Sequence, residues 1–139
     1  MSVEFKHNEF LIFIFSKDML KLLVYSNNGK YDGLLYQEDK ECKDAAEVYL
    51  SEKIFNHTDL KIEPSSLRRV VSLQNIEKKW KINVMMTTAE LPDKFKNEHI
   101  EIISLLELPY NCHPGMMWLV PLCIDLSVYG SEFNQILMK

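Results

Sequence analysis

Apolar residues occur in short runs separated by polar turns, a pattern that predicts mainly β-strands in the first third of the chain. The uninterrupted run 10–15 is aromatic and aliphatic, which is typical of a central strand covered on both faces. A second strand is expected at 19–25. The sequence Ser26-Asn-Asn-Gly-Lys30 that follows predicts a turn to a short segment at 31–35, because Asn and Gly tolerate positive φ.

The middle of the chain combines a helical pattern with two strand patterns. Residues 40–55 contain no Gly, Pro or Asn but do contain Ala45, Ala46, Leu50 and several Glu and Lys, and they predict a helix that Asn56-His-Thr58 ends. Strands are expected at 67–73 and 80–87, with the polar residues 74–79 as their hairpin connection. Residues 89–97 are expected to form a charged loop.

The last third of the chain is strongly apolar. Residues 99–108 predict a strand, and residues 109–115 a loop with two prolines. Pro121 leaves the state of the apolar segment 116–129 open, since proline removes a backbone donor from a helix. A short terminal helix is expected at 131–139, with Ser131 as its cap. This order predicts an α+β fold with helices on a mixed sheet, in a single domain spanning 1–139.

Composition narrows the classes of function. The chain has 139 residues and a formal net charge of −4. Because no basic excess supplies phosphate contacts, no nucleic-acid partner is expected. The apolar run 10–15 is much shorter than the roughly 20 residues that a membrane span needs, so no membrane association is expected. Three scattered cysteines do not suit a disulfide framework and favour the reducing cytoplasm.

Residues 32–55 resemble the box of the Nudix hydrolases. In that family a Gly and a Glu precede the sequence Arg-Glu-apolar-any-Glu-Glu-any-Gly-apolar, and the box forms a loop–helix–loop on an α/β/α sandwich. The resemblance therefore implies a Nudix-like sandwich with a mixed central sheet. The matching positions are Gly33 for the first Gly, Asp39 for the first Glu, Glu52 for the last Glu and Phe55 for the closing apolar residue.

The box departs from the family pattern at the positions that carry its chemistry. Val48 and Ser51 stand where the pattern has Glu. On a helix, positions 48, 51 and 52 span roughly a third of the circumference, so three carboxylates there would suit Mg²⁺ or Mn²⁺. Only Glu52 remains. Glu47 replaces the Arg of the pattern, and Ile54 replaces its second Gly.

The resemblance also implies candidate catalytic and metal-binding residues. In an active enzyme, Glu52 and Glu98 would be the catalytic residues, with Glu98 as a general base in a loop like the one that reaches toward a Nudix active site. Glu52 and Asp39 would bind Mg²⁺ or Mn²⁺. Each has a plainer interpretation. Glu52 suits an exposed helix face, Asp39 suits a helix N-terminus, and Glu98 lies in a charged segment that solvent would surround.

Four residues are candidates for ligand binding. Gly33 opens the box, and one side chain of the pair Arg68–Arg69 would face a phosphate, because adjacent residues of a strand point to opposite faces. Trp118 would stack against a nucleotide base. The alternatives are a solvent-facing arginine pair at a sheet edge and a tryptophan packed against the sheet.

Three hypotheses follow. The first is a Nudix-fold protein with a degenerate box that binds a nucleotide or another phosphorylated ligand, or serves as an interaction module. The second is a divergent pyrophosphohydrolase of nucleoside diphosphate derivatives that depends on Mg²⁺ or Mn²⁺. The third is a partner-binding or homodimeric structural protein that uses the apolar segment 116–128 as its interface.

Overall fold

The computed structural model describes residues 5–39, 41, 43–108, 112, 114–129 and 136–137. Its strands are β1 (His7–Ser16), β2 (Lys21–Asn27), β3 (Lys30–Asp32), β4 (Leu34–Gln37), β5 (Arg68–Asn75), β6 (Trp80–Ala89), β7 (Ile100–Ser104) and β8 (Ile136–Leu137). Its helices are α1 (Ala46–Thr58) and α3 (Met116–Tyr129), with the short 3₁₀ turns η1 (Pro64–Ser66) and η2 (Leu105–Glu107).

The strands form one mixed sheet in the order β3-β2-β1-β6-β5-β8. β4 also pairs with β1, and β7 with β2. At the centre, β1 and β6 run parallel from the pair His7–Trp80 to the pair Ser16–Ala89. β5 and β6 are antiparallel neighbours, so the predicted hairpin is confirmed. Its connection is 76–79 rather than 74–79, because Gln74 and Asn75 still pair with β6.

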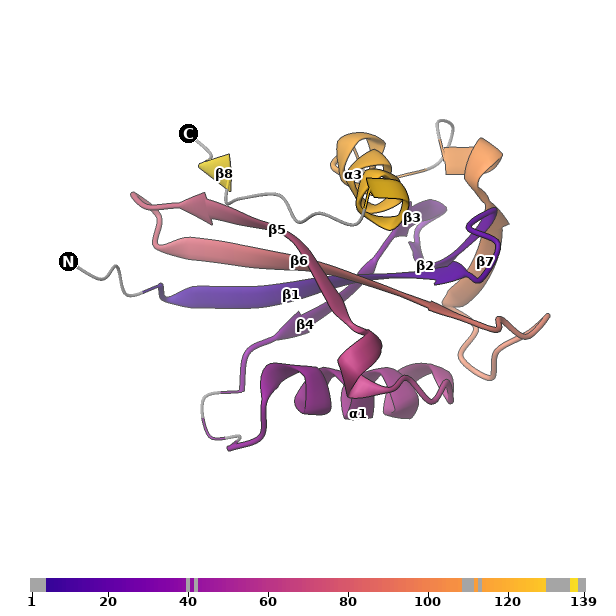
Figure 1. Cartoon of the computed structure of the whole chain (residues 1–139), viewed down its shortest axis with the longest axis horizontal. Helices are drawn as coiled ribbons and strands as arrows, with labels where there is room; N and C mark the ends of the chain where they lie inside the picture. Colours follow the sequence, from indigo (N-terminus) through magenta and orange to yellow (C-terminus); the bar gives the residue numbers. More distant parts are fainter. Residues whose placement is uncertain are drawn as a thin grey trace.

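The two helices cover opposite faces of the sheet (Figure 1). Successive residues of a strand point to opposite faces, so β1 contributes to two separate cores. This confirms that the run 10–15 is a central strand covered on both sides. The buried side chains divide into Leu11, Phe13 and Phe15 on the α3 face and Phe10, Ile12 and Ile14 on the α1 face.

Helix α1 begins at Ala46, six positions after the predicted start at residue 40. The prediction was wrong there because helix propensity is weak without packing, and the first buried apolar residue of α1 is Leu50. The helix continues to Thr58. Asp59 ends it in the left-handed region at φ 63°, and its amide donates to the carbonyl of Phe55 at 2.8 Å.

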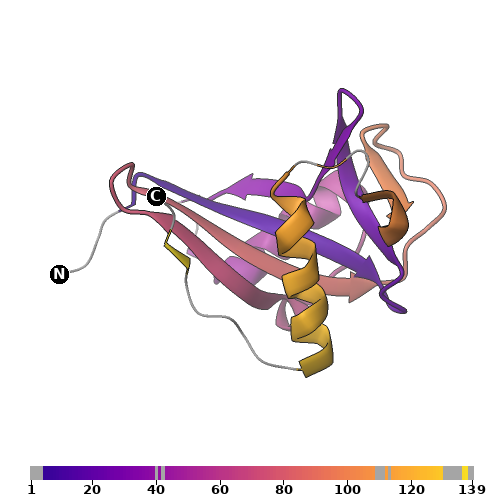
Figure 2. The same cartoon turned by 90° about the horizontal axis from the view of Figure 1, so that it is seen from above.

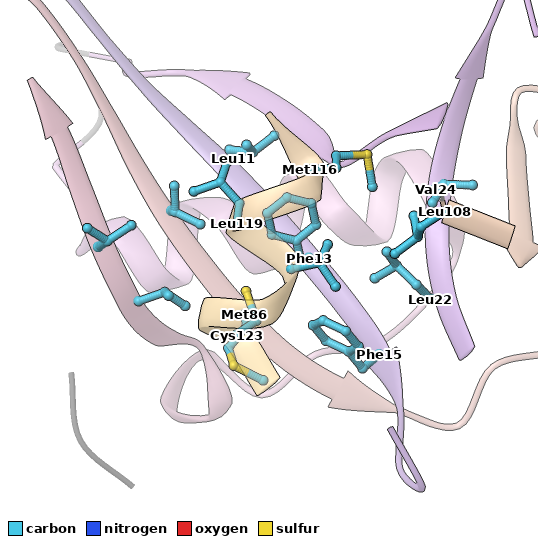
Figure 3. Close-up of a cluster of buried hydrophobic side chains, with 14 of the residues drawn as sticks. Leu11, Phe13, Phe15, Leu22, Val24, Met86, Leu108, Met116, Leu119 and Cys123 are labelled. Carbon is cyan, nitrogen blue, oxygen red and sulfur yellow. The ribbon is translucent and has the colours of Figure 1, made fainter. Parts of the chain in front are cut away.

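The segment 116–129, which the sequence left open, is the helix α3. Figure 2 shows it crossing above the sheet. Figure 3 shows that Met116, Leu119 and Cys123 lie over the aromatic residues of β1. Pro121 lies inside the helix but is exposed. Neither helix of the described part of the chain is long and apolar enough to cross a membrane.

The predicted terminal helix at 131–139 is wrong for Ile136 and Leu137, which form β8 parallel to β5. These two residues form a strand because β5, on the side away from β6, offers backbone groups that a further segment can pair with. The other residues of the predicted helix lie outside the described residues.

Candidate functional site

The outward face of α1 carries the box positions. Residues three, four and seven positions apart share one face of a helix, so Val48, Ser51, Glu52 and Phe55 lie together. Glu52 is exposed, and Val48 and Phe55 keep 36% and 40% of their surface exposed. Ser51 is buried, and its hydroxyl donates to the carbonyl of Val48 at 2.9 Å. The face that would hold three carboxylates therefore has one.

A groove of about 440 Å³ runs beside this face. Its size falls in the usual range for small-molecule sites. The groove combines an aromatic ring, a carboxylate, a hydroxyl, an amide and an ammonium group, a set that suits a ligand with a flat ring and polar substituents. The lining residues are Ser51, Glu52, Phe55, Asn56, Lys61 and Ile62.

The groove residues do not fit a magnesium or manganese site. Such an ion requires several oxygen ligands at about 2.1 Å, and Glu52 is the only acid in the lining. Among the described residues, no three His, Cys, Asp or Glu side chains converge as a ligand set. Asp39 lies before α1, where its carboxylate accepts a hydrogen bond from the amide of Glu41 at 3.0 Å.

Glu98 lies in the segment between β6 and β7. Its side chain is 89% exposed, and its carboxylate is 3.9 Å from Nε2 of His99. The ring of His99 in turn contacts the ring of Tyr25 on β2, with 5.5 Å between their centroids. Glu98 does not line the groove beside α1.

Gly33 lies between β3 and β4, against the buried centre of β1. A β-carbon at this position would be 2.8 Å from Cε1 of Phe13 and 3.0 Å from the carbonyl oxygen of Ile12. Both distances are shorter than ordinary contacts, so close packing alone accounts for a glycine here. Its amide donates to the carboxylate of Asp32 at 2.8 Å.

The remaining predicted ligand-binding residues lie apart from the groove. Arg68 and Arg69 are exposed at the start of β5. Trp118 is 40% exposed on α3, and α3 lies on the opposite face of the sheet from Glu52 (Figure 1). Trp118 and Glu52 therefore cannot line the same site.

Sequence reasoning missed three groove residues: Asn56, Lys61 and Ile62. Asn56 was assigned to the end of the helix rather than to a site. Lys61 and Ile62 follow the left-handed residue Asp59, which turns the chain after α1. The box pattern ends before these residues, so no motif pointed to them.

No family model and no curated protein matches the chain. Solved structures match over most of its length, and three examples illustrate the likeness. An ADP-ribose pyrophosphatase from Streptococcus suis 89-1591 has a TM-score of 0.66 and 16% identity, covering 95% of this chain and 98% of its own. A NUDIX hydrolase from Nitrosomonas europaea has a TM-score of 0.65 and 7% identity, covering 99% and 83%.

The third example is the C-terminal domain of mouse MUTYH, solved in complex with human PCNA, with a TM-score of 0.66 and 8% identity, covering 94% of each chain. At such identities the likeness concerns the backbone and not the site. The α+β architecture and the Nudix-like sandwich expected from the box are confirmed. This chain, with its mixed sheet between α1 and α3, has the fold of the Nudix hydrolases.

Proposed function

We propose that this protein binds a nucleotide or another phosphorylated small molecule in the groove beside α1 and does not hydrolyse it. One observation carries the proposal: the groove lies on the helix face where the Nudix box places its acids, but Val48 and Ser51 replace two of them. The groove offers space for a small molecule, while Glu52 is the one acid among the described residues of its lining.

The lining supports distinct contacts with the parts of a nucleotide. The exposed ring of Phe55 offers a stacking surface, and stacking of a base on an aromatic side chain contributes about 1–3 kcal/mol. The ammonium group of Lys61 offers a positive charge to a phosphate. The carboxylate of Glu52 is a hydrogen-bond acceptor for ribose hydroxyls or an exocyclic amine.

Isothermal titration against a panel of nucleoside mono-, di- and triphosphates tests the binding, with and without Mg²⁺ or Mn²⁺. A phosphate-release assay on the same panel tests hydrolysis. We expect binding without turnover. No binding to any member of the panel would overturn the proposal, and turnover that Glu52→Ala abolishes would favour the metal-dependent pyrophosphohydrolase instead.

Matched variants locate the site. Phe55→Ala and Lys61→Ala are expected to weaken binding by about tenfold each, which corresponds to ~1.4 kcal/mol. Trp118→Ala is the control for Phe55, because both side chains are 40% exposed but lie on opposite faces of the sheet. Lys53→Ala is the control for Lys61, because the Lys53 ammonium lies over Tyr49, 5.6 Å from the ring centroid, outside the groove.

A second candidate function is an interaction module that uses α3. Met117 and Trp118 keep 52% and 40% of their surface exposed, and Pro121 is exposed beside them. Exposed apolar clusters on a helix favour contact with another protein, and the structurally similar MUTYH domain was solved bound to a protein. Light scattering after gel filtration tests a homodimer. A monomer for both the wild type and Trp118→Glu would contradict it.

A further inference from the structure

Two histidines and two tyrosines form a continuous series of contacts between α1, the sheet and the segment before β7. The Tyr36 hydroxyl lies 3.1 Å from Nδ1 of His57 on α1. The His57 ring lies 5.9 Å from the ring of Tyr25 on β2, and Tyr25 lies 5.5 Å from His99. These four residues, here called the His–Tyr series, join elements that are distant in the sequence.

The series is attached to the fold at both ends. His57 belongs to the last turn of α1, and the amide of Asp59 closes that turn by donating to the carbonyl of Phe55 at 2.8 Å. At the other end, the carbonyl of His99 accepts a hydrogen bond from the amide of Ser26 at 2.7 Å. The two histidines of the series therefore lie at the last turn of α1 and beside the start of β7.

We propose that the His–Tyr series is a pH-sensitive joint, in which neutral His57 holds the last turn of α1 on the sheet and protonated His57 loosens it. The hydrogen bond between Tyr36 and His57 is the central contact. In the neutral tautomer with its proton on Nε2, Nδ1 accepts the hydroxyl proton of Tyr36. Protonation converts Nδ1 into a donor. The Tyr36 hydroxyl oxygen would then accept from Nδ1, and the hydroxyl proton would need a different acceptor.

Burial favours the neutral form of His57. Desolvation lowers the pKa of this imidazole below its usual value of 6.5. At His57, the folded state therefore binds fewer protons than the unfolded chain does at pH values near and below 6.5. The stabilising effect of His57 is therefore complete above pH 6.5 and is lost as the pH falls toward its folded pKa.

The groups around His57 shift its pKa in opposite directions. From the sheet it faces the uncharged rings of Tyr25 and Tyr36, and beyond Tyr25 lies His99 with the carboxylate of Glu98. On its own helix, Lys53 lies one turn earlier, and the free carbonyls of the last turn favour a positive charge there. Burial of the ring lowers the pKa of His57, opposite to the effect of the helix terminus.

Nuclear magnetic resonance on the whole chain tests the joint. The ring signals of His57 give its pKa directly, and hydrogen exchange gives the protection factor of the Asp59 amide, corrected for the intrinsic rate. Between about pH 7.5 and pH 5, we expect this protection to fall about three- to tenfold more in the wild type than in His57→Gln. His7→Gln, on β1 and outside the His–Tyr series, is the control and should behave like the wild type.

Tyr36→Phe provides a second test that does not remove the histidine. It deletes the hydroxyl that donates to neutral Nδ1, so the pKa of His57 should rise relative to the wild type. A wild-type His57 that titrates at or above 6.5, or equal pH dependence of Asp59 protection in the wild type and His57→Gln, would overturn the proposal. An unchanged His57 pKa in Tyr36→Phe would also do so.

Discussion

Two glycines, Gly29 and Gly33, are required for different physical reasons. Gly29 adopts φ 78° after Asn28 at φ 54° in the turn between β2 and β3, and its β-carbon position is open. Gly33 has ordinary backbone angles but no room for a β-carbon beside Phe13. The first glycine of the box-like segment is thus explained by packing against β1.

Gly33→Ala should lower the free energy of unfolding by about 2–3 kcal/mol, because the added methyl group meets a buried ring and a backbone carbonyl that cannot both move away. Urea denaturation measures the loss. Gly29→Ala is the control, with an expected cost of ~1 kcal/mol from its positive φ. Equal stability of Gly33→Ala and the wild type would show that β1 and β4 separate readily.

Two cysteines of the described chain differ in their surroundings. Burial raises the pKa of the Cys123 thiol to about 12, whereas Cys112 is half-buried, and its thiol donates to the sulfur of Met117 at 3.5 Å. At about pH 8, an alkylating reagent should modify Cys112 on the order of 100-fold faster than Cys123. Peptide mapping by mass spectrometry measures both rates. Equal rates in the native protein would contradict the burial, and equal rates in urea are the expected control.

At the scale of elements, the two helices pack differently against the sheet. Helix α1 buries Leu50 and Ile54 but leaves the box face open to the groove. Helix α3 buries Met116, Leu119 and Cys123, and it leaves Met117 and Trp118 exposed. We therefore propose the small-molecule site beside α1 and the protein contact on α3.

Pro121→Ala should raise the free energy of unfolding by about 1–2 kcal/mol. Proline lacks the amide proton that would donate to the Met117 carbonyl, and it costs ~3 kcal/mol relative to alanine in a helix interior. Its exposure means that little packing is lost. Thermal and urea denaturation measure the change.

Pro64→Ala is the matched control, because Pro64 begins η1, where proline is well accommodated. It should leave stability unchanged or lower it slightly. Unchanged or lower stability of Pro121→Ala would contradict the cost assigned to a proline inside α3.

At the scale of the whole molecule, local sequence patterns predicted the strands and helices better than the contacts between them. The run 10–15 and the hairpin at 74–79 carry local signals, so the central strand and the β5–β6 pair followed from the residues. The parallel pairing of β1 with β6 joins segments that share no local signal. The groove also needed the structure, because Asp59, rather than a glycine, makes the left-handed turn that brings Lys61 beside α1.

The chain has the fold of the Nudix hydrolases, and the box-like helix carries one of the three carboxylates of the family pattern, Glu52, so adding the other two should create metal binding. The double substitution Val48→Glu and Ser51→Glu would place three carboxylates with Glu52 within roughly a third of the helix circumference, a set that suits Mn²⁺. Ser51 is buried but lines the groove, so a glutamate at this position has to direct its carboxylate into the groove. Titration calorimetry and electron paramagnetic resonance should detect Mn²⁺ binding in this variant, and it should be at least about tenfold tighter than in the wild type. The double glutamine variant is the control for side-chain size and should show no gain. A folded double glutamate variant with wild-type Mn²⁺ affinity would show that this face of α1 is not arranged as a metal-binding face.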